Sequence, residues 1–257
     1  MGIVALIGRS GEDFEVSCIG ERPMRRDPFK RHRFPSGIIL LAVRWYCRYP
    51  LSYRDVRDML AERGVSVDAA TIYRWVQKFG PEIAERTARH RSWRGLDWHV
   101  DETYIRVGGA WRYLWRAVDQ RGRMIDFRLT ARRDARAARA FLKQARGMAR
   151  LYQPLAIFTD KAPAYARVIG EINRRLGTDD AIVHIDRKWM NNRIESDHAS
   201  LKRIIDPGKG FQTLRSAKAT LQGVEAMRTI KRGHVHGKPA GIPGEVSFVH
   251  GLFGIPA

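Results

Sequence analysis

Residues 98–119 carry the feature that most restricts the fold of this chain. Their sequence, WHVDETYIRVGGAWRYLWRAVD, contains two strand-like aromatic runs joined by Gly108-Gly109, a pair that favours the tight turn of a β-hairpin. Two adjacent carboxylates, Asp101 and Glu102, lie within the first run, where burial of charge is costly. Because side chains alternate between the two faces of a strand, these acids must point in opposite directions. We interpret Asp101 as part of a site and Glu102 as a structural partner of a nearby basic side chain.

The elements that follow this hairpin predict the fold class. GRMIDFRLTA is a third strand, a helix follows over roughly residues 134–148, and PLAIFTD and AIVHI are apolar runs typical of buried strands. APAYARVIGEINRRLG and NNRIESDHASLKRII are predicted helices, the first with Pro163 near its first turn. An antiparallel meander that continues into alternating helices and strands gives an α/β mixed sheet with flanking helices. That order matches the ribonuclease H-like fold.

Residues 34–92 predict a small all-α domain ahead of the sheet. SGIILLAVRWYCRYP is a helix, and Ser52 begins a second helix with Asp55 in the capping-box position. Asp68 can cap a third helix, AATIYRWVQKFG. We interpret Pro81 and the arginine-rich run ERTARHRSWRG as a linker to the next domain.

The third helix has an inner and an outer face. Apolar side chains at helical spacing predict that the inner face is made of Ile72, Trp75, Val76 and Phe79. The outer face carries the residues that would contact DNA in a helix-turn-helix, namely Thr71, Arg74 and Lys78. The alternative is an ordinary helical bundle with a solvated basic face.

The composition favours a polyanionic partner. The chain has 257 residues, a hydrophobic content of 44% and a formal net charge of +20, so we expect a globular protein that binds nucleic acid or, as a second candidate, an anionic membrane surface. No run of 18 apolar residues is present, which predicts the absence of a membrane span. Cys18 and Cys47 make neither a disulfide framework nor a zinc site, which favours the reducing setting of the cytoplasm.

The predicted domain boundaries follow from these segments. Residues 1–33 are a flexible leader, with Met24 as a possible native start, and residues 34–92 form the helical domain. Residues 93–235 form the ribonuclease H-like domain, and residues 236–257 are a Gly- and Pro-rich tail that differs in composition from the rest.

Three carboxylates are expected to converge. Asp101 lies in the first strand, Asp160 is the last residue of the fourth, and Glu195 is on the helix after the fifth. The first and fourth strands are neighbours in a sheet of this kind. Three converging carboxylates repel one another unless cations lie between them, and oxygen ligands suit Mg²⁺ or Mn²⁺. Two such ions would support phosphoryl transfer. The alternative is that each acid pairs with an arginine.

Other polar residues near these acids are assigned structural roles. Asp197 lies about 200° around the helix from Glu195 and cannot share its site, and Asp119 and Asp126 have arginines nearby. His198 can approach the site, but a contact with a backbone or phosphate group is the favoured interpretation.

A later helix carries the apolar stripe Leu214, Ala217, Leu221 and Val224. We expect this helix to pack on the catalytic sheet. It is also expected to touch DNA with its basic residues Lys218, Arg228, Lys231 and Arg232.

HVDETYIRVGGAWRYLWRAVDQRG, FTDKAPAY and NNRIESDHASLKRII resemble the three catalytic blocks of the DDE transposases of bacterial insertion sequences. More narrowly, they are similar to the insertion-sequence-six family, over a stretch from about Phe29 to about Lys231. The resemblance implies that Asp101, Asp160 and Glu195 are the metal-binding triad, with two Mg²⁺ or Mn²⁺ ions. It also implies that Lys202, seven positions after the glutamate, contacts DNA beside the cleaved phosphate.

The resemblance further implies a bacterial, cytoplasmic and nucleoid-associated enzyme. Such an enzyme binds double-stranded DNA at the terminal inverted repeats of its element, frees 3′-hydroxyls and joins them to target DNA as cointegrates. A homodimer is expected in the working complex, with no membrane partner. Two alternatives remain, namely a catalytically inert repressor or end-binding protein, and an integrase-like nuclease of the same fold.

Overall fold

The structure is a computed structural model that describes residues 27–92, 95–149, 153–160, 162–186, 192–206 and 209–256. The chain divides into two compact units at the bond between Pro35 and Ser36. In the first unit, residues 27–35 form a turn in which the Phe29 N–H donates to the Asp27 side chain. Most of the predicted leader lies outside the described residues, including Cys18 and the possible start at Met24.

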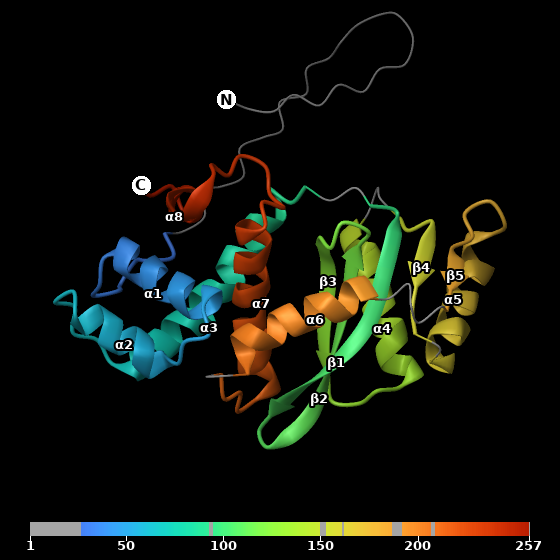
Figure 1. The fold of residues 1–257 in the computed structure, drawn as a ribbon, viewed down its shortest axis with the longest axis horizontal. Helices are drawn as coiled ribbons and strands as arrows, with labels where there is room; N and C mark the ends of the chain where they lie inside the picture. Colours follow the sequence, from blue (N-terminus) through green and yellow to red (C-terminus); the bar gives the residue numbers. More distant parts are fainter. Residues whose placement is uncertain are drawn as a thin grey trace, which may run out of the picture. The chain divides into compact units, whose positions relative to one another are not determined.

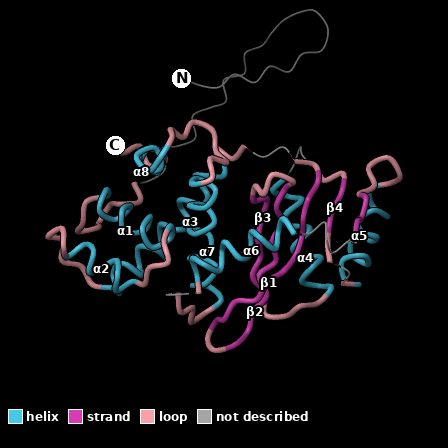
Figure 2. The backbone as a smooth tube through the Cα atoms, in the orientation of Figure 1, coloured by secondary structure: helices cyan, strands magenta, loops and turns pink. Residues whose placement is uncertain are grey.

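A five-stranded mixed sheet forms the centre of one half of the second unit (Figures 1 and 2). The strand order is β3-β2-β1-β4-β5, in which β1 pairs antiparallel with β2 and parallel with β4. The strands are β1 (Asp97–Val107), β2 (Ala110–Asp119), β3 (Met124–Thr130), β4 (Ala156–Phe158) and β5 (Val183–Ile185). The predicted element order and the adjacency of β1 and β4 are confirmed, and the topology is that of the ribonuclease H-like class.

Two glycines allow the β1–β2 hairpin to form. Gly108 and Gly109 have φ values of 57° and 77°, a left-handed conformation that is strained for other residues. Val107 pairs directly with Ala110, so the loop contains only these two residues. The register of β1 against β2 therefore begins at the turn and places Asp101 opposite Arg116.

Helices cover both faces of the sheet. On one face, α4 (Ala135–Ala149) and α5 (Pro163–Leu176) pack against a core that includes Trp98, Val100 and Trp115. On the other face, Ile194 of α6 (Asn192–Ile205) packs against Val118 and Met124. The α6 helix runs across the strands in Figure 1. Since Asp101 alternates with Val100 and Glu102, it faces α6.

Two details of the sheet differ from the prediction. The run AIVHI was expected to be a buried strand, but β5 is an edge strand and Val183 is 59% exposed. It has a neighbouring strand on one side only. The fourth strand ends at Phe158, so Asp160 lies two residues beyond it rather than at its last position.

The helical part of the second unit contains α1 (Ser36–Arg48), α2 (Tyr53–Ala61) and α3 (Ala69–Ala88). The capping box is confirmed, because the Ser52 side chain accepts from the Asp55 N–H while the Asp55 carboxylate accepts from the Ser52 N–H. The predicted inner face of α3 is also confirmed, since all four of its residues are at most 2% exposed: Ile72, Trp75, Val76 and Phe79.

The predicted linker at Pro81 is wrong, because α3 continues through this proline to Ala88. Packing of α3 against α7 (Leu214–Lys231) stabilises the helix beyond the point where local propensity would end it. A Cβ added to Gly223 would lie 3.0 Å from the Gly80 Cα and 2.7 Å from the Cys47 Sγ. Glycine at position 223 therefore lets α1, α3 and α7 meet closely.

The α7 helix also corrects an expectation. It was predicted to pack on the catalytic sheet, but its main contact is with α3, and its contact with β3 is smaller. Three residues of the predicted stripe are buried, namely Ala217, Leu221 and Val224, whereas Leu214 is 38% exposed.

The Gly- and Pro-rich tail contains a helix, α8 (Gly241–Gly251). Glu245 is buried and forms an ion pair of 3.0 Å with Arg48 of α1. Arg86 of α3 donates to the Leu252 carbonyl and lies over the Phe253 ring. These contacts attach the tail to the helical part of the unit. Within the described ranges, no helix is long and apolar enough to cross a membrane.

Replacing Gly223 with alanine is expected to destabilise the chain by about 1–3 kcal/mol, because the new methyl group has no room between Cys47 and Gly80. Thermal unfolding should show a Tm lower by roughly 2–10 °C. Gly170→Ala in α5 is the matched control, since nothing lies within 4 Å of a Cβ there and alanine favours the helix. Equal stability of the two variants would contradict the close helix crossing.

Candidate active site

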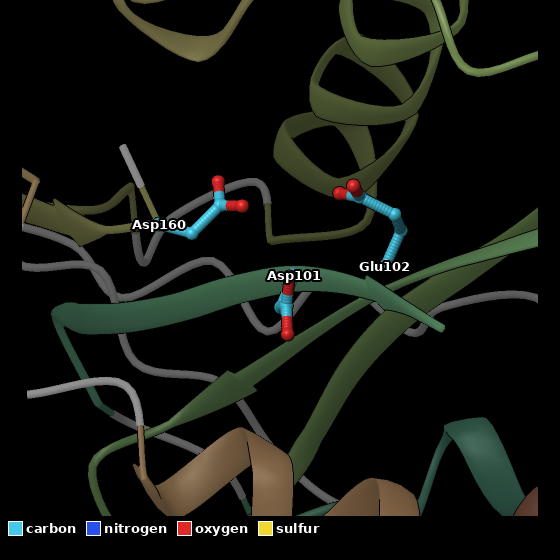
Figure 3. A group of neighbouring side chains, drawn as sticks. All are labelled: Asp101, Glu102 and Asp160. Atoms are coloured by element: carbon cyan, nitrogen blue, oxygen red, sulfur yellow. The ribbon is translucent and has the colours of Figure 1, made fainter. Parts of the chain in front are cut away.

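Asp101 of β1 and Asp160, two residues beyond β4, lie close together, as the sequence predicted. The parallel register pairs His99 of β1 with Phe158 of β4, and each acid follows this pair by two residues. Carboxylate oxygens of Asp101, Glu102 and Asp160 all lie within 4.8 Å of one another (Figure 3). Such a group of hard oxygen donors has the chemistry of a divalent-cation site.

Glu102 belongs to this group by distance, but its carboxylate already has partners. It accepts a hydrogen bond of 2.6 Å from the Tyr165 hydroxyl and forms an ion pair with Arg133. Figure 3 shows the Glu102 side chain directed away from that of Asp101, on the opposite side of β1. The predicted pairing of Glu102 with a basic residue is therefore confirmed.

Arg133 and Tyr165 are site residues that sequence reasoning missed. Arg133 connects Glu102 to Asp160, whose carboxylate oxygen lies 3.4 Å from the guanidinium. Together with Trp115, these side chains line a cleft of about 390 Å³ beside Asp160. The only sequence signal was the basic run ARRDAR before α4, and nothing in that run distinguishes Arg133 from its neighbours.

The environment of Asp101 disfavours its charged form. Its pKa is raised to about 7, first by burial and next by the negative charge of Glu102. The charges of Asp160 and Glu195 act in the same direction. A bound cation would offset this repulsion and favour the ionised carboxylate.

Glu195 lies outside the group of close carboxylates. It is exposed in the first turn of α6, although its charge is near enough to raise the pKa of Asp101. Residues 187–191, which precede α6, lie outside the described residues. The structure thus brings two of the three predicted acids together and leaves the third at the surface of the helix that covers Asp101.

His198 approaches the site, as the sequence predicted it could, and its contact with a phosphate stays a prediction. Its side chain is buried, and its Nδ1 lies 3.7 Å from Asp101 Oδ2. The α6 helix packs Ile194 and His198 onto the same sheet face as Asp101.

Asp197 is structural, as predicted. It accepts a hydrogen bond of 2.8 Å from Arg228 Nη2 and forms ion pairs with Arg116 and Arg232. Glu225 also pairs with Arg116 and Arg228. We refer to this group, made of the buried residues Arg116, Asp197, Glu225 and Arg228 and of the exposed Arg232, as the arginine cradle. Nearby positive charge holds the pKa of Asp197 well below its usual range despite burial.

The arginine cradle corrects the expectation that Arg228 touches DNA, because this side chain is 4% exposed and its guanidinium is used inside the protein. The other two acids are structural, as predicted. Asp119 accepts from the backbone of Arg121 and from Arg123, and Asp126 accepts from Gln144.

The four candidate DNA-contacting residues lie on two helices. Lys202 is half-buried on α6, two turns after Glu195. On α3, Thr71 is half-buried, and both Arg74 and Lys78 are exposed. The α3 residues thus belong to a different element from those that carry the carboxylates.

Known proteins resemble the chain over most of its length. A family model described as a DDE domain matches residues 95–234, which is more than half of the chain. The transposase for insertion sequence-like element IS431mec of Staphylococcus aureus (strain Mu50 / ATCC 700699) is 37% identical over 203 residues. The match covers 77% of this chain and 86% of that relative. The chain belongs to the DDE transposases of bacterial insertion sequences, in the insertion-sequence-six family.

This chain also matches the transposase for insertion sequence element IS257 in transposon Tn4003 of Staphylococcus aureus, with the same identity and coverage. Among solved structures, it is similar to the HTLV-2 integrase catalytic core domain in complex with magnesium. That match has a TM-score of 0.40 and 19% identity, over 54% of this chain and 88% of that one. As a member of its family, the transposase is a polynucleotidyl transferase.

Asp101→Asn is expected to stabilise the transposase at pH 8 in the absence of divalent cations. The folded-state pKa of about 7 exceeds the ordinary value of 3.8, so ionisation of Asp101 lowers the stability of the native state as the pH rises through 7. Asparagine removes this charge. The Tm should be higher than that of the native chain by at least about 2 °C at pH 8, the shift that roughly 1 kcal/mol produces at this size. At pH 4 the difference should disappear.

Asp55→Asn is the control of opposite sign for this measurement. The hydrogen bond from the Ser52 backbone lowers the pKa of Asp55, because it stabilises the ionised carboxylate. Loss of the carboxylate charge in Asp55→Asn should therefore reduce the Tm at pH 8. A lower Tm for Asp101→Asn than for the native chain at pH 8 would contradict the conclusion that burial and negative neighbours disfavour the ionised Asp101 carboxylate.

Proposed function

We propose that the transposase binds the terminal inverted repeats of its insertion sequence, cuts the DNA to free 3′-hydroxyls, and joins these to target DNA as cointegrates. The observation that supports this most directly is the proximity of Asp101 and Asp160, whose carboxylate oxygens lie within 4.8 Å of each other, together with Glu195 on α6, the helix that covers Asp101. The relatives are named as transposases of insertion sequence elements, which supports the same class of reaction.

The carboxylates fit a divalent cation by donor type and by electrostatics. Oxygens of Asp101 and Asp160 approach within 4.8 Å, and the pKa of Asp101 is raised by burial and by negative neighbours. We propose that Asp101, Asp160 and Glu195 hold two Mg²⁺ or Mn²⁺ ions. When bound, these ions would supply activation of the attacking hydroxyl or water and stabilisation of the leaving oxygen.

Glu195 is proposed as the third ligand in place of Glu102. The side chain of Glu102 is 2% exposed, forms an ion pair with Arg133 and accepts a hydrogen bond from Tyr165, whereas Glu195 is exposed at the start of α6. Displacing Arg133 from Glu102 would leave a buried charge unpaired, which is costly. Rotation of the Glu195 side chain toward Asp101 has no such cost.

The remaining residues are proposed to hold DNA. Lys202 follows Glu195 on α6 and would contact the phosphate beside the cleaved bond. Arg74 and Lys78 are exposed on α3 and would bind phosphates of the inverted repeat, and Thr71 would contact base edges. The net charge of +20 supports a polyanionic partner. In this proposal residues 34–92 recognise the element end and residues 93–235 carry out the chemistry.

The working complex is proposed to be a homodimer, because transposition joins two ends of one element. The enzyme would act on DNA in the bacterial cytoplasm, at the nucleoid. Both statements follow from the proposed substrate.

Strand cleavage and transfer on a labelled duplex that carries the native element end, with Mg²⁺, test the assignment of the ligands. Asp101→Asn, Asp160→Asn and Glu195→Gln should each reduce the rate by about 100-fold or more, with end binding retained in a gel-shift assay. Glu102→Gln is the matched variant and should stay within about tenfold of the native rate, since the Glu102 side chain is directed away from Asp101 and is not proposed as a ligand.

The outcomes of this assay separate the alternatives. Loss of activity in Glu102→Gln with activity retained in Glu195→Gln would contradict the proposed triad. Binding of the end without any chemistry would favour an inert end-binding protein, and cleavage without strand transfer would favour an integrase-like nuclease.

The salt dependence of end binding tests the role of α3. If Arg74 contacts one phosphate, Arg74→Ala should lower the slope of log K against log salt by about 0.9 and weaken binding at all sequences. Arg57→Ala on α2 is the control, because that guanidinium is exposed and paired with Asp58. A slope unchanged by Arg74→Ala would exclude this phosphate contact.

A further inference from the structure

We propose that His198 is a positioning residue for Asp101. In this proposal the His198 Nδ1–H holds one oxygen of the Asp101 carboxylate, and the arginine cradle around Asp197 fixes His198 in place. The inference rests on the proposed function, because it concerns how Asp101 is oriented for a cation.

The first support is the geometry between β1 and α6. Asp101 and His198 both lie in the layer between the sheet and α6, where His198 Nδ1 is 3.7 Å from Asp101 Oδ2. This separation is longer than a direct N–H···O hydrogen bond, which is about 3 Å. Catalytic hydrogen bonds are often long before ligands bind and shorten afterwards. A small rotation of the carboxylate would bring the two atoms into contact.

The second support is the way in which α6 is fixed. Asp197 precedes His198, and its side chain and carbonyl both accept from Arg228 Nη2, at 2.8 Å and 3.0 Å. Arg116, which is fully buried, pairs with Asp197 and stands directly opposite Asp101 in the hairpin register. The arginine cradle therefore connects the backbone of α6 to the strand beside Asp101, which sets the distance between His198 and that carboxylate.

The surroundings of the imidazole agree with a donor at Nδ1. Nδ1 is the ring nitrogen that faces the Asp101 carboxylate, and an ionised carboxylate can only accept hydrogen bonds. In the described part of the chain, Nε2 is buried without a hydrogen-bond partner.

A donor at this position has a specific use. A carboxylate that binds a cation through one oxygen remains free to rotate unless its other oxygen is held. Hydrogen bonds from outside the ligand set fix the orientation of ligands, and their loss typically costs about 10–100-fold in metal affinity. A histidine that only filled space in the core would not require a ring nitrogen at Asp101.

The test is Mn²⁺ binding to the full chain without DNA, followed by the electron paramagnetic resonance signal of the free ion. His198→Asn keeps a donor near the position of Nδ1 and should bind Mn²⁺ within about threefold of the native chain. His198→Gln places its amide near the position of Nε2, and His198→Ala has no donor. Both should bind about 10–100-fold more weakly. Ser196→Ala, at an exposed position of the same helix, is the control and should match the native chain.

The comparison of His198→Asn with His198→Gln does not depend on His198→Ala being stable, and thermal unfolding checks that all four variants are folded. Equal weakening in the asparagine and glutamine variants would overturn the proposal, as would native affinity in all of them. Failure of the native chain to bind Mn²⁺ would instead contradict the proposed metal site itself. Saturable binding that is indifferent to His198 would contradict only this inference.

Discussion

The ion network that joins α6 to the sheet is the interaction on which the candidate site depends. Asp197 and Glu225 both pair with Arg116 and Arg228, and these four side chains are buried. Asp197 also pairs with the exposed Arg232. Burying charges costs solvation energy, and removal of one partner from such a group leaves the others uncompensated. The arrangement therefore specifies one position of α6 more strongly than apolar packing alone would. The positions of Glu195, His198 and Lys202, which all lie on α6, therefore depend on this ion network.

A second constraint connects this helix to the rest of the chain. The α7 helix carries Glu225 and Arg228 toward α6, and on its other contacts it crosses α3 at Gly223 and Gly80. The α7 helix thus contributes residues to the arginine cradle and also packs in the core of the helical part of the unit. Lys209, just beyond α6, is buried and donates to the Tyr49 and Ile204 carbonyls, which adds a further link between α6 and the segment after α1.

The sequence was sufficient for features with a local physical cause. The alternation of strands separated Asp101 from Glu102, the turn at Gly108-Gly109 set the hairpin, and the Ser52 capping box began α2 where expected. The order of the elements placed β1 beside β4, and hence Asp101 near Asp160.

The errors arose where a distant partner decides the outcome. Packing against α7 carries α3 through Pro81, and the exposure of Val183 depends on β5 having one neighbouring strand. The burial of Arg228 depends on Asp197, which is 31 residues earlier. Arg133 and Tyr165 were missed because their partner, Glu102, lies on a different element. Sequence periodicity predicts which face of a helix or strand is apolar, but it does not predict which other element packs against that face.

The most direct test of the account is a crystal structure of the transposase with Mn²⁺ and its element end, with the ions located by anomalous scattering. The account predicts peaks coordinated by Asp101, Asp160 and Glu195, with the Glu195 side chain turned toward the other two. Glu102 should keep its bonds to Arg133 and Tyr165. An ion held by Glu102 in place of Glu195, or the absence of any ion at Asp101, would contradict the central claim.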